Sequence, residues 1–188
     1  MPSTCPTTWA TFNAIPVSAS PIGHTVCAMT DQEPAVAAGH PPETLLRIVN
    51  PMLRKLLRTP LAGSLRKQLM VLNFKGRKSG REFSIPVSAH HIDGALYAIA
   101  NAGWKHNFSG GADADVLHNG KTTKMHGEVI SDPATVAALA HRAAEAYGVK
   151  KAQTMMGLRF RDDRIPTVDE FAEAFARDKI VAVKFTPR

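Results

Sequence analysis

A short loop between two predicted strands concentrates cationic groups. Residues 75–81 read Lys-Gly-Arg-Lys-Ser-Gly-Arg, so four cations, two glycines and one hydroxyl fall within seven residues. Glycines let the backbone turn its N–H groups toward one point, while Arg offers a charged fork and Lys a point charge for a phosphate. A Walker A loop would need GxxxxGK[ST] between a strand and a helix, which this loop lacks. The pattern indicates an anion-binding loop, with a solvated basic turn as the alternative.

The loop ends a longer segment that carries charge of one sign. No Asp or Glu occurs from Thr44 to Arg81, and the whole chain has a formal net charge of +7. The cations of this basic block are Arg47, Arg54, Lys55, Arg58, Arg66, Lys67, Lys75, Arg77, Lys78 and Arg81. Such a block attracts anions, whether phosphate esters, nucleic acid or an anionic membrane surface. Base-stacking aromatics are not interleaved with these cations, so we expect no nucleic-acid partner.

A second candidate ligand-binding loop spans residues 101–111 and is rich in glycine and polar side chains. It holds Trp104, one of only two tryptophans. A large ring in such a loop can wall a pocket for a flat ligand, which Asn107 would orient by hydrogen bonds. The alternative is that Trp104 caps one end of the core. The histidines show no HExxH or comparable spacing, and no GxSxG elbow is present, so we expect neither a metal site nor a hydrolase triad.

Six segments have the composition of strands and would position these loops. They are Gln68–Lys75, Arg81–His90, Ala95–Ala100, Ala114–His118, Lys121–Ile130 and Lys179–Thr186. Asp93-Gly94 and Asn119-Gly120 are two-residue hairpin signals. The pattern predicts an α+β fold in which six antiparallel strands form a small β-barrel with flanking helices.

Three amphipathic helices are expected around these strands. Residues 45–58 have an apolar stripe opposite a cationic face. Asp132-Pro133 opens a second helix that runs to about Tyr147, and Thr167-Val-Asp-Glu170 is a capping box that opens a third.

The N-terminal segment differs in composition from the rest of the chain. Residues 1–30 contain no charged side chain, four prolines and nine Ser or Thr, so we expect residues 1–42 to be a disordered extension and residues 43–188 to form the folded domain. The segment does not have the pattern of a secretory signal, and no apolar run reaches the ~20 residues of a membrane span. We therefore expect a cytoplasmic protein, with peripheral membrane contact through helix 45–58 as an alternative.

Several motifs in order resemble a known family. They are Gly76-Arg-Lys-Ser-Gly80 between two strands, Ile85-Pro-Val87, Trp104-x-x-Asn107-Phe108 and Gly110-Gly111. Together they resemble the deazaflavin-dependent nitroreductase family, a branch of the split β-barrel flavin-binding superfamily that includes pyridoxamine phosphate oxidase. The resemblance covers about residues 50–187. It implies a six-stranded split β-barrel and an oxidoreductase that passes a hydride from reduced coenzyme F-420, an 8-hydroxy-5-deazaflavin, to a quinone, a nitro compound or an enone.

The resemblance also implies roles for individual residues. The loop cations would hold the phosphodiester and polyglutamate tail of F-420, the backbone around Pro86 would flank the ring, and the tryptophan loop would close the site. The implied cofactor-binding residues are Arg77, Lys78, Ser79, Gly80, Pro86, Val87, Gly103, Trp104 and Asn107. Tyr147 is a candidate for a catalytic tyrosine, with core packing as its alternative role.

Two other functions remain open. FMN could replace the deazaflavin, as in other branches of the superfamily. A protein of the same fold could also bind a flavin or deazaflavin without catalysis, or dock helix 45–58 on an anionic membrane.

Overall fold

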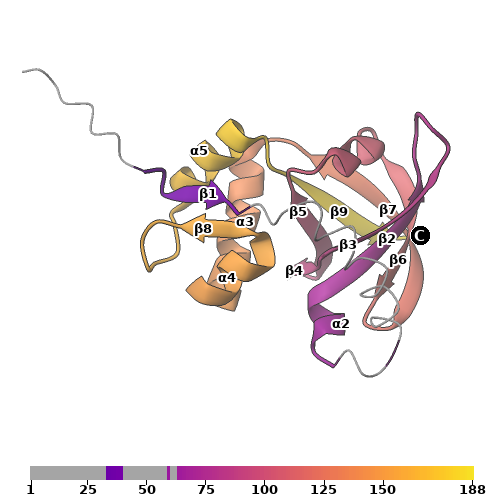
Figure 1. Ribbon diagram of the computed structural model, residues 1–188, viewed down its shortest axis with the longest axis horizontal. Coiled ribbons are helices and arrows are strands. Elements are labelled where there is room, and N and C mark those ends of the chain that lie inside the picture. The colour runs from indigo at the N-terminus through magenta and orange to yellow at the C-terminus, as the bar shows by residue number, and fades with distance from the viewer. Residues whose placement is uncertain (1–32, 40–58, 60–62) are drawn as a thin grey trace, which may run out of the picture. The chain divides into compact units, whose positions relative to one another are not determined.

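The computed structural model describes residues 33–39, 59 and 63–188, all of which fall in the second of the two units into which the chain divides, residues 33–188 (Figure 1). The predicted helix 45–58 and most of the predicted extension 1–42 lie outside the described residues. Among the helices that are described, none has the length and apolar character needed to cross a bilayer.

A seven-stranded antiparallel sheet organises the described residues, which gives a mixed α+β fold. Its strands are β2 (Leu69–Lys75), β3 (Glu82–Ser88), β4 (His90–Ile92), β5 (Ala95–Ala100), β6 (Ala112–His118), β7 (Lys121–Ile130) and β9 (Val181–Pro187). Their spatial order is β3-β2-β6-β7-β9-β5-β4, and every neighbouring pair is antiparallel.

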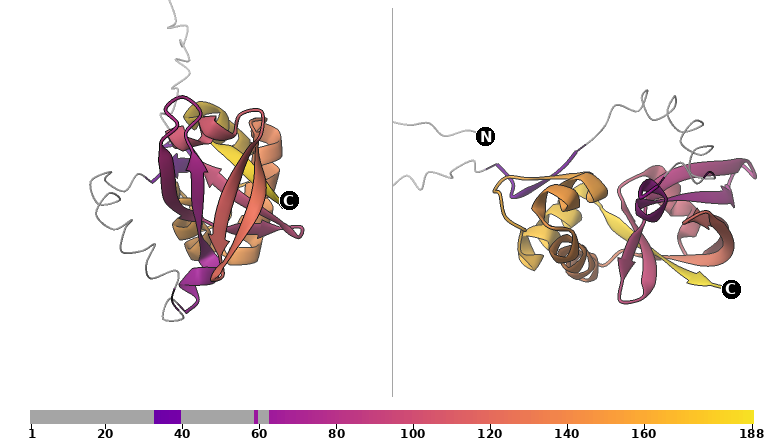
Figure 2. Two further views of the ribbon diagram at one scale, coloured as in Figure 1. Left: turned by 90° about the vertical axis from the view of Figure 1, so that its right-hand side faces the viewer. Right: turned by 90° about the horizontal axis from the view of Figure 1, so that it is seen from below.

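The sheet curls because its two edge strands are consecutive in the chain. β3 pairs with β2 up to Ser88, where Ser88 lies opposite Leu69, and the N–H of Ala89 donates to the carbonyl of Gln68 at 2.8 Å. His90 then pairs with Tyr97 of β5 at the opposite edge. One residue cannot span a flat sheet of seven strands, whose neighbours are ~4.8 Å apart, so the sheet bends into the half-barrel visible in both views of Figure 2.

The division of the chain at Ala89 also shows that the predicted number of strands is wrong. The sequence predicts one strand over residues 81–90, within a set of six. The structure divides this segment at Ala89 into β3 and β4, which belong to different edges of the sheet. Continuous β-type composition across Ala89 carries no sign of this change of partner.

The predicted hairpin turns are confirmed. Asp93 and Gly94 join β4 to β5 with φ values of 50° and 76°, and Asn119 and Gly120 join β6 to β7 with φ values of 48° and 79°. Positive φ at both central residues is the requirement of a type I′ turn, which Asn or Asp followed by Gly meets. Both turns therefore follow from local sequence.

Helices cover one end of the sheet. α3 (Pro133–Tyr147) is capped by Asp132, whose carboxylate accepts from the Thr135 N–H at 2.8 Å, and α5 (Val168–Asp178) begins with the predicted capping box of Thr167 and Glu170. Both predicted helices are confirmed. The structure adds α4 (Val149–Met156) and the short α2 (Leu65–Gln68), which the sequence does not predict.

A separate two-stranded sheet lies beside these helices. β1 (Val36–Ala38) pairs antiparallel with β8 (Leu158–Phe160), and Val36 is 1% exposed. The sequence places residues 36–38 in the extension that ends at residue 42, whereas the structure places them in a strand whose partner is more than a hundred residues away. A pairing at such separation has no local signal.

The apolar interior has two main parts. One lies inside the curl, where β2, β5, β6, β7 and β9 contribute such residues as Met70, Leu72 and Phe185. The other lies between the helices and strands β4, β5 and β9, with Phe171 and Phe175 of α5 at its centre. We call these the inner core and the helical core.

Candidate functional site

The basic loop between β2 and β3 is a tightly hydrogen-bonded turn. The Gly76 N–H donates to the Arg81 carbonyl and the Gly80 N–H donates to the Gly76 carbonyl, both at 2.8 Å. The Arg81 N–H also donates to Ser79 Oγ at 3.3 Å. A Cβ on Gly76 would lie 2.6 Å from the ring of Phe83, so a larger residue there would displace this ring. This packing fixes the backbone that carries the loop's cations.

The tryptophan loop forms a 3-10 turn, η2 (Gly103–Phe108), that is anchored at both of its faces. Phe108 is fully buried and inserts its ring into the inner core, where Gly127 leaves space because a Cβ there would lie 2.6 Å from that ring. The aromatic neighbours of Phe108 are Phe74, Trp104 and Phe185, with ring centroids 5.1 to 5.9 Å away. Lys105 Nζ donates to the Lys179 carbonyl at 2.5 Å, which ties the turn to the end of α5.

Asn107 joins the basic loop to η2. Its Oδ1 accepts from the Arg77 N–H at 3.1 Å, and its Nδ2 donates to the Trp104 carbonyl at 3.0 Å. The Arg77 guanidinium also donates to the Ser109 carbonyl, immediately after the turn. The two motifs that the sequence singles out are thus held together by side chains of the motifs themselves.

A hollow of about 560 Å³ lies between the loop and the turn, and we call it the loop–turn hollow. Its walls include Arg77, Lys78, Ser79, Gly103 and Asn107, which are five of the predicted site residues. Phe83 of β3 and His106 of η2 also line it and are not among the predicted residues. Phe83 is 38% exposed and stacks on Phe74 with the ring centroids 5.5 Å apart, so it presents a flat apolar face at the edge of the hollow.

The side chains of the two cations of the hollow, Arg77 and Lys78, differ in whether a hydrogen bond holds them in place. Arg77 already uses one N–H group on the Ser109 carbonyl, which orients its planar fork. Lys78 is exposed and forms no hydrogen bond or ion pair with the described part of the chain. A fixed fork beside a free ammonium group suits the recognition of a phosphate or carboxylate, which both cations bind by charge-assisted hydrogen bonds.

Four predicted binding residues do not line this hollow. Trp104 is half-buried and its ring meets Phe108 edge-on at 5.9 Å, so it packs on the inner core. Pro86 and Val87 lie further along β3, opposite Val71 and Met70 of β2. Gly80 closes the basic loop with φ +63°, a conformation that glycine adopts without strain.

Tyr147 lies in another part of the fold. It is the last residue of α3, packs against the helical core and hydrogen-bonds His90 Nδ1 at 3.2 Å. Burial raises the pKa of its hydroxyl. Since Tyr97, the second tyrosine of the chain, is also buried in the helical core, neither tyrosine lines the loop–turn hollow.

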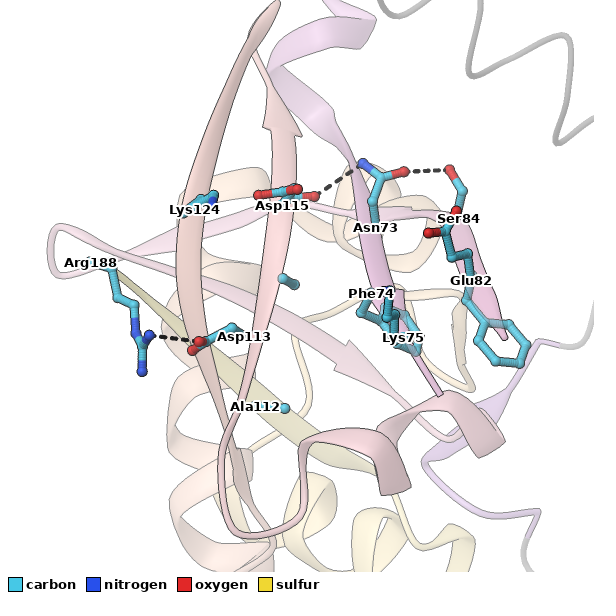
Figure 3. A pocket seen from close by; sticks show the side chains of 12 residues that line it. Asn73, Phe74, Lys75, Glu82, Ser84, Ala112, Asp113, Asp115, Lys124 and Arg188 are labelled. Carbon is cyan, nitrogen blue, oxygen red and sulfur yellow. Dashed lines mark hydrogen bonds and ion pairs between the residues drawn. The ribbon is translucent and has the colours of Figure 1, made fainter. Parts of the chain in front are cut away.

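A larger hollow of about 850 Å³ lies over β2, β3, β6 and β7 and has a different character (Figure 3). In Figure 3 Arg188 reaches Asp113, with which it forms an ion pair at 2.7 Å. Asn73 donates to the Asp115 carbonyl at 3.1 Å and accepts from the Ser84 hydroxyl at 2.6 Å. The lining of this hollow carries charges of both signs, since the acidic Asp113 and Asp115 lie beside Lys124. Among the described residues, the loop–turn hollow is lined by cations without an acidic side chain.

Comparison with known proteins gives similarity at the level of structure alone. No protein-family model and no curated protein matches the chain. One similar solved structure is a domain-swapped dimer, 17% identical with a TM-score of 0.41 over 78% of this chain and 100% of that chain. Another is a conserved hypothetical protein from Mycobacterium tuberculosis, 14% identical with a TM-score of 0.41 over 85% of this chain and 86% of that chain. Neither similarity assigns an activity to this chain.

Proposed function

We propose that this chain is an oxidoreductase with a split β-barrel fold that binds reduced coenzyme F-420 in the loop–turn hollow and passes its hydride to a quinone, a nitro compound or an enone. The observation that carries the proposal is the Asn107 bridge, which brings the basic loop and η2 to opposite sides of one hollow. Two of the motifs of the resemblance, Gly76–Gly80 and Trp104–Phe108, are thus neighbours in space.

The residues of the hollow fit an anionic, ring-bearing cofactor. Arg77 and Lys78 supply positive charge for a phosphodiester and a carboxylate tail. Phe83 offers an exposed ring face on which a flat heterocycle can stack. A Cβ added to Gly103 would meet no atom within 4 Å, so η2 leaves open space on its side of the hollow.

The role of the protein in this proposal is to bind and orient. The reduced deazaflavin supplies the hydride when it is bound. Loop cations would hold the tail, Asn107 keeps the two walls at a fixed separation, and Phe83 of β3 would stack on the ring. An acceptor would then meet the ring from the open side of the hollow.

A second function is favoured by one specific observation. Tyr97 lies in the helical core and Tyr147 packs against it, so neither tyrosine of the chain is at the hollow to position or protonate an acceptor. A protein that binds the cofactor without turnover would need the same cations but no such group. FMN in place of F-420 is the further alternative, because its phosphate would use the same loop.

Equilibrium titration with F-420, FMN and FAD, each at low and high salt, tests the proposal. The double variant Arg77→Ala with Lys78→Ala should weaken F-420 binding at least ~10-fold and flatten its salt dependence, because charge-assisted contacts are lost. Lys150→Ala with Arg159→Ala removes the same charge from exposed sites elsewhere and should bind as the wild type does.

The outcomes separate the alternatives. Tight, salt-sensitive binding of F-420 together with oxidation of the reduced cofactor by a quinone supports the oxidoreductase. Binding without oxidation by any quinone, nitro or enone acceptor supports the binding protein, and a preference for FMN supports the flavin enzyme. If the site variant binds F-420 as tightly as the control variant, the loop is not the binding site.

A further inference from the structure

Two histidines from separate hairpins meet at the far end of the curled sheet. His91 lies in the edge strand β4, and His118 ends β6 just before the turn to β7. Their Nε2 atoms are 2.9 Å apart and their ring centroids 5.0 Å apart. β4 and β6 are not neighbours in the sheet, so the curl brings the two rings together.

Hydrogen bonding fixes which nitrogen of His118 carries the proton. Its Nδ1 lies 3.2 Å from the Leu69 carbonyl oxygen, which can only accept, so Nδ1 must donate. In the neutral ring the Nε2 of His118 is then an acceptor whose lone pair is directed at His91. Histidine ligands of metal ions are held in the same way, with the second ring N–H donated to a carbonyl or carboxylate.

The separation of the two nitrogens matches the requirement of a single metal ion. Two ligands each ~2.05 Å from a metal are ~2.9 Å apart at adjacent positions of a square-planar or octahedral ion, and ~3.3 Å apart at a tetrahedral one. The observed 2.9 Å is the length of a hydrogen bond between the two rings and also equals the separation in the first case. A metal ion would replace this hydrogen bond after both rings turn so that their lone pairs converge on it. To bind the ion through Nε2, the neutral His91 ring must change tautomer, so that its proton moves from Nε2 to Nδ1.

We propose that His91 and His118 form a binding site for one divalent transition-metal ion, with Cu²⁺ and Ni²⁺ as the ions whose geometry it fits. The described residues contain no cluster of three or more side chains able to ligate a metal, so the remaining coordination positions belong to water or a small ligand. These positions open on a hollow of about 720 Å³ that both rings line. Lys121 and Lys184 also line it and repel a bare dication, so an anionic ligand on the metal would offset their charge.

This site is independent of the proposed cofactor site. β6 begins next to η2, where the Gly111 N–H donates to the Phe108 carbonyl, and it ends at His118. Seven strand residues span ~20 Å. A metal ion at the histidine pair would join the edge strand β4 to the β6–β7 hairpin and so close one end of the curl.

Calorimetric titration of the untagged full chain with Ni²⁺, after removal of metal by a chelator and at about pH 7.5 where imidazole is neutral, tests the site. We expect one Ni²⁺ per chain at this site. His91→Ala and His118→Ala should each lower the affinity at least ~10-fold, since each removes one of two protein ligands. His126→Ala is the matched control, because His126, like His118, is half-buried on a strand, but it pairs with Asp113.

Thermal unfolding of the same four proteins separates loss of ligand from loss of fold. In metal-free buffer His91→Ala, an exposed edge position, should melt with the wild type, and Ni²⁺ should raise the Tm of the wild type and of His126→Ala only. Ni²⁺ binding that survives both His91→Ala and His118→Ala, or affinity in the millimolar range in the wild type, would overturn the proposal.

Discussion

His90 is a buried imidazole whose charging the fold opposes. Its ring is 0% exposed, its Nδ1 shares a hydrogen bond with the Tyr147 hydroxyl at 3.2 Å, and its Nε2 has no partner among the described residues. Burial lowers the pKa of His90 from 6.5 to about 4, and the neighbouring His91 adds to the effect. The native state therefore keeps His90 neutral at pH values where the unfolded chain protonates it.

This difference makes the free energy of unfolding depend on pH in a defined direction. Between pH 6.5 and about 4 the unfolded chain binds a proton at His90 that the native state does not. Stability therefore rises with pH in this window and falls as the solution is acidified. At ~1.4 kcal/mol for each pH unit, the full window amounts to about 3 kcal/mol.

Urea unfolding of the wild type and of His90→Leu at a series of pH values measures this contribution. The wild type should lose about 3 kcal/mol more than His90→Leu between about pH 7 and about pH 4. The variant loses the Tyr147 hydrogen bond, which lowers its free energy of unfolding by the same amount at each pH. The comparison therefore uses the slope of the free energy of unfolding against pH in each protein.

Other titrating groups do not obscure the comparison. Burial also lowers the pKa of His118, which adds a slope of the same sign to both proteins and cancels in the difference. The Arg164 guanidinium lowers the pKa of the Glu170 carboxyl to about 2, so its stabilising effect is lost on acidification below its usual value of 4.5, mostly beneath the His90 window. Equal slopes for the wild type and His90→Leu would refute the assignment of a neutral, buried His90.

Three further substitutions test the site and its supports. Asn107→Leu removes both hydrogen bonds of the bridge and should cost ~1–3 kcal/mol in urea unfolding, with faster amide exchange in the basic loop; unchanged exchange would mean that the bridge does not hold the loop. Gly127→Ala forces a Cβ to 2.6 Å from the Phe108 ring and should cost ~1–3 kcal/mol, whereas Gly103→Ala, with nothing within 4 Å, should leave the Tm unchanged; equal shifts would contradict the packing. Thr167→Ala breaks the capping box of α5 and should cost ~1 kcal/mol by the same assay, and a cost near zero would indicate that the cap is not formed in solution.

Much of the fold is predictable wherever the determinants are local. Asp93-Gly94 and Asn119-Gly120 specify their turns by backbone conformation alone, and Thr167 with Glu170 specifies a helix start through two hydrogen bonds within four residues. The division of residues 81–90 at Ala89 is not predictable, because it depends on which strand is available at the other edge of the sheet. The pairing of β1 with β8 is not predictable for the same reason, because the two strands are distant in the sequence.

The candidate site divides in the same way. Its two motifs can be recognised in the sequence because the glycines and cations of each loop are close together along the chain. The Asn107 side chain then joins the two loops in space. Phe83 and His106 escape prediction because their membership depends on how the loop and turn are packed, which no spacing records. Phe83 enters through its stacking on Phe74, a neighbour across the ladder between β2 and β3.

The two ends of the curled sheet illustrate why sequence motifs reveal one kind of site and not the other. At the loop end, most groups that line the hollow come from two continuous segments, so each segment retains a recognisable pattern. At the other end, His91 and His118 are single residues on strands that are not neighbours, and only the bend imposed at Ala89 brings their Nε2 atoms to 2.9 Å. A lone histidine on a strand is far more often structural than functional, so no pattern in the sequence pairs them. The pair becomes a candidate metal site only once the Leu69 carbonyl is seen to fix the proton on Nδ1 of His118.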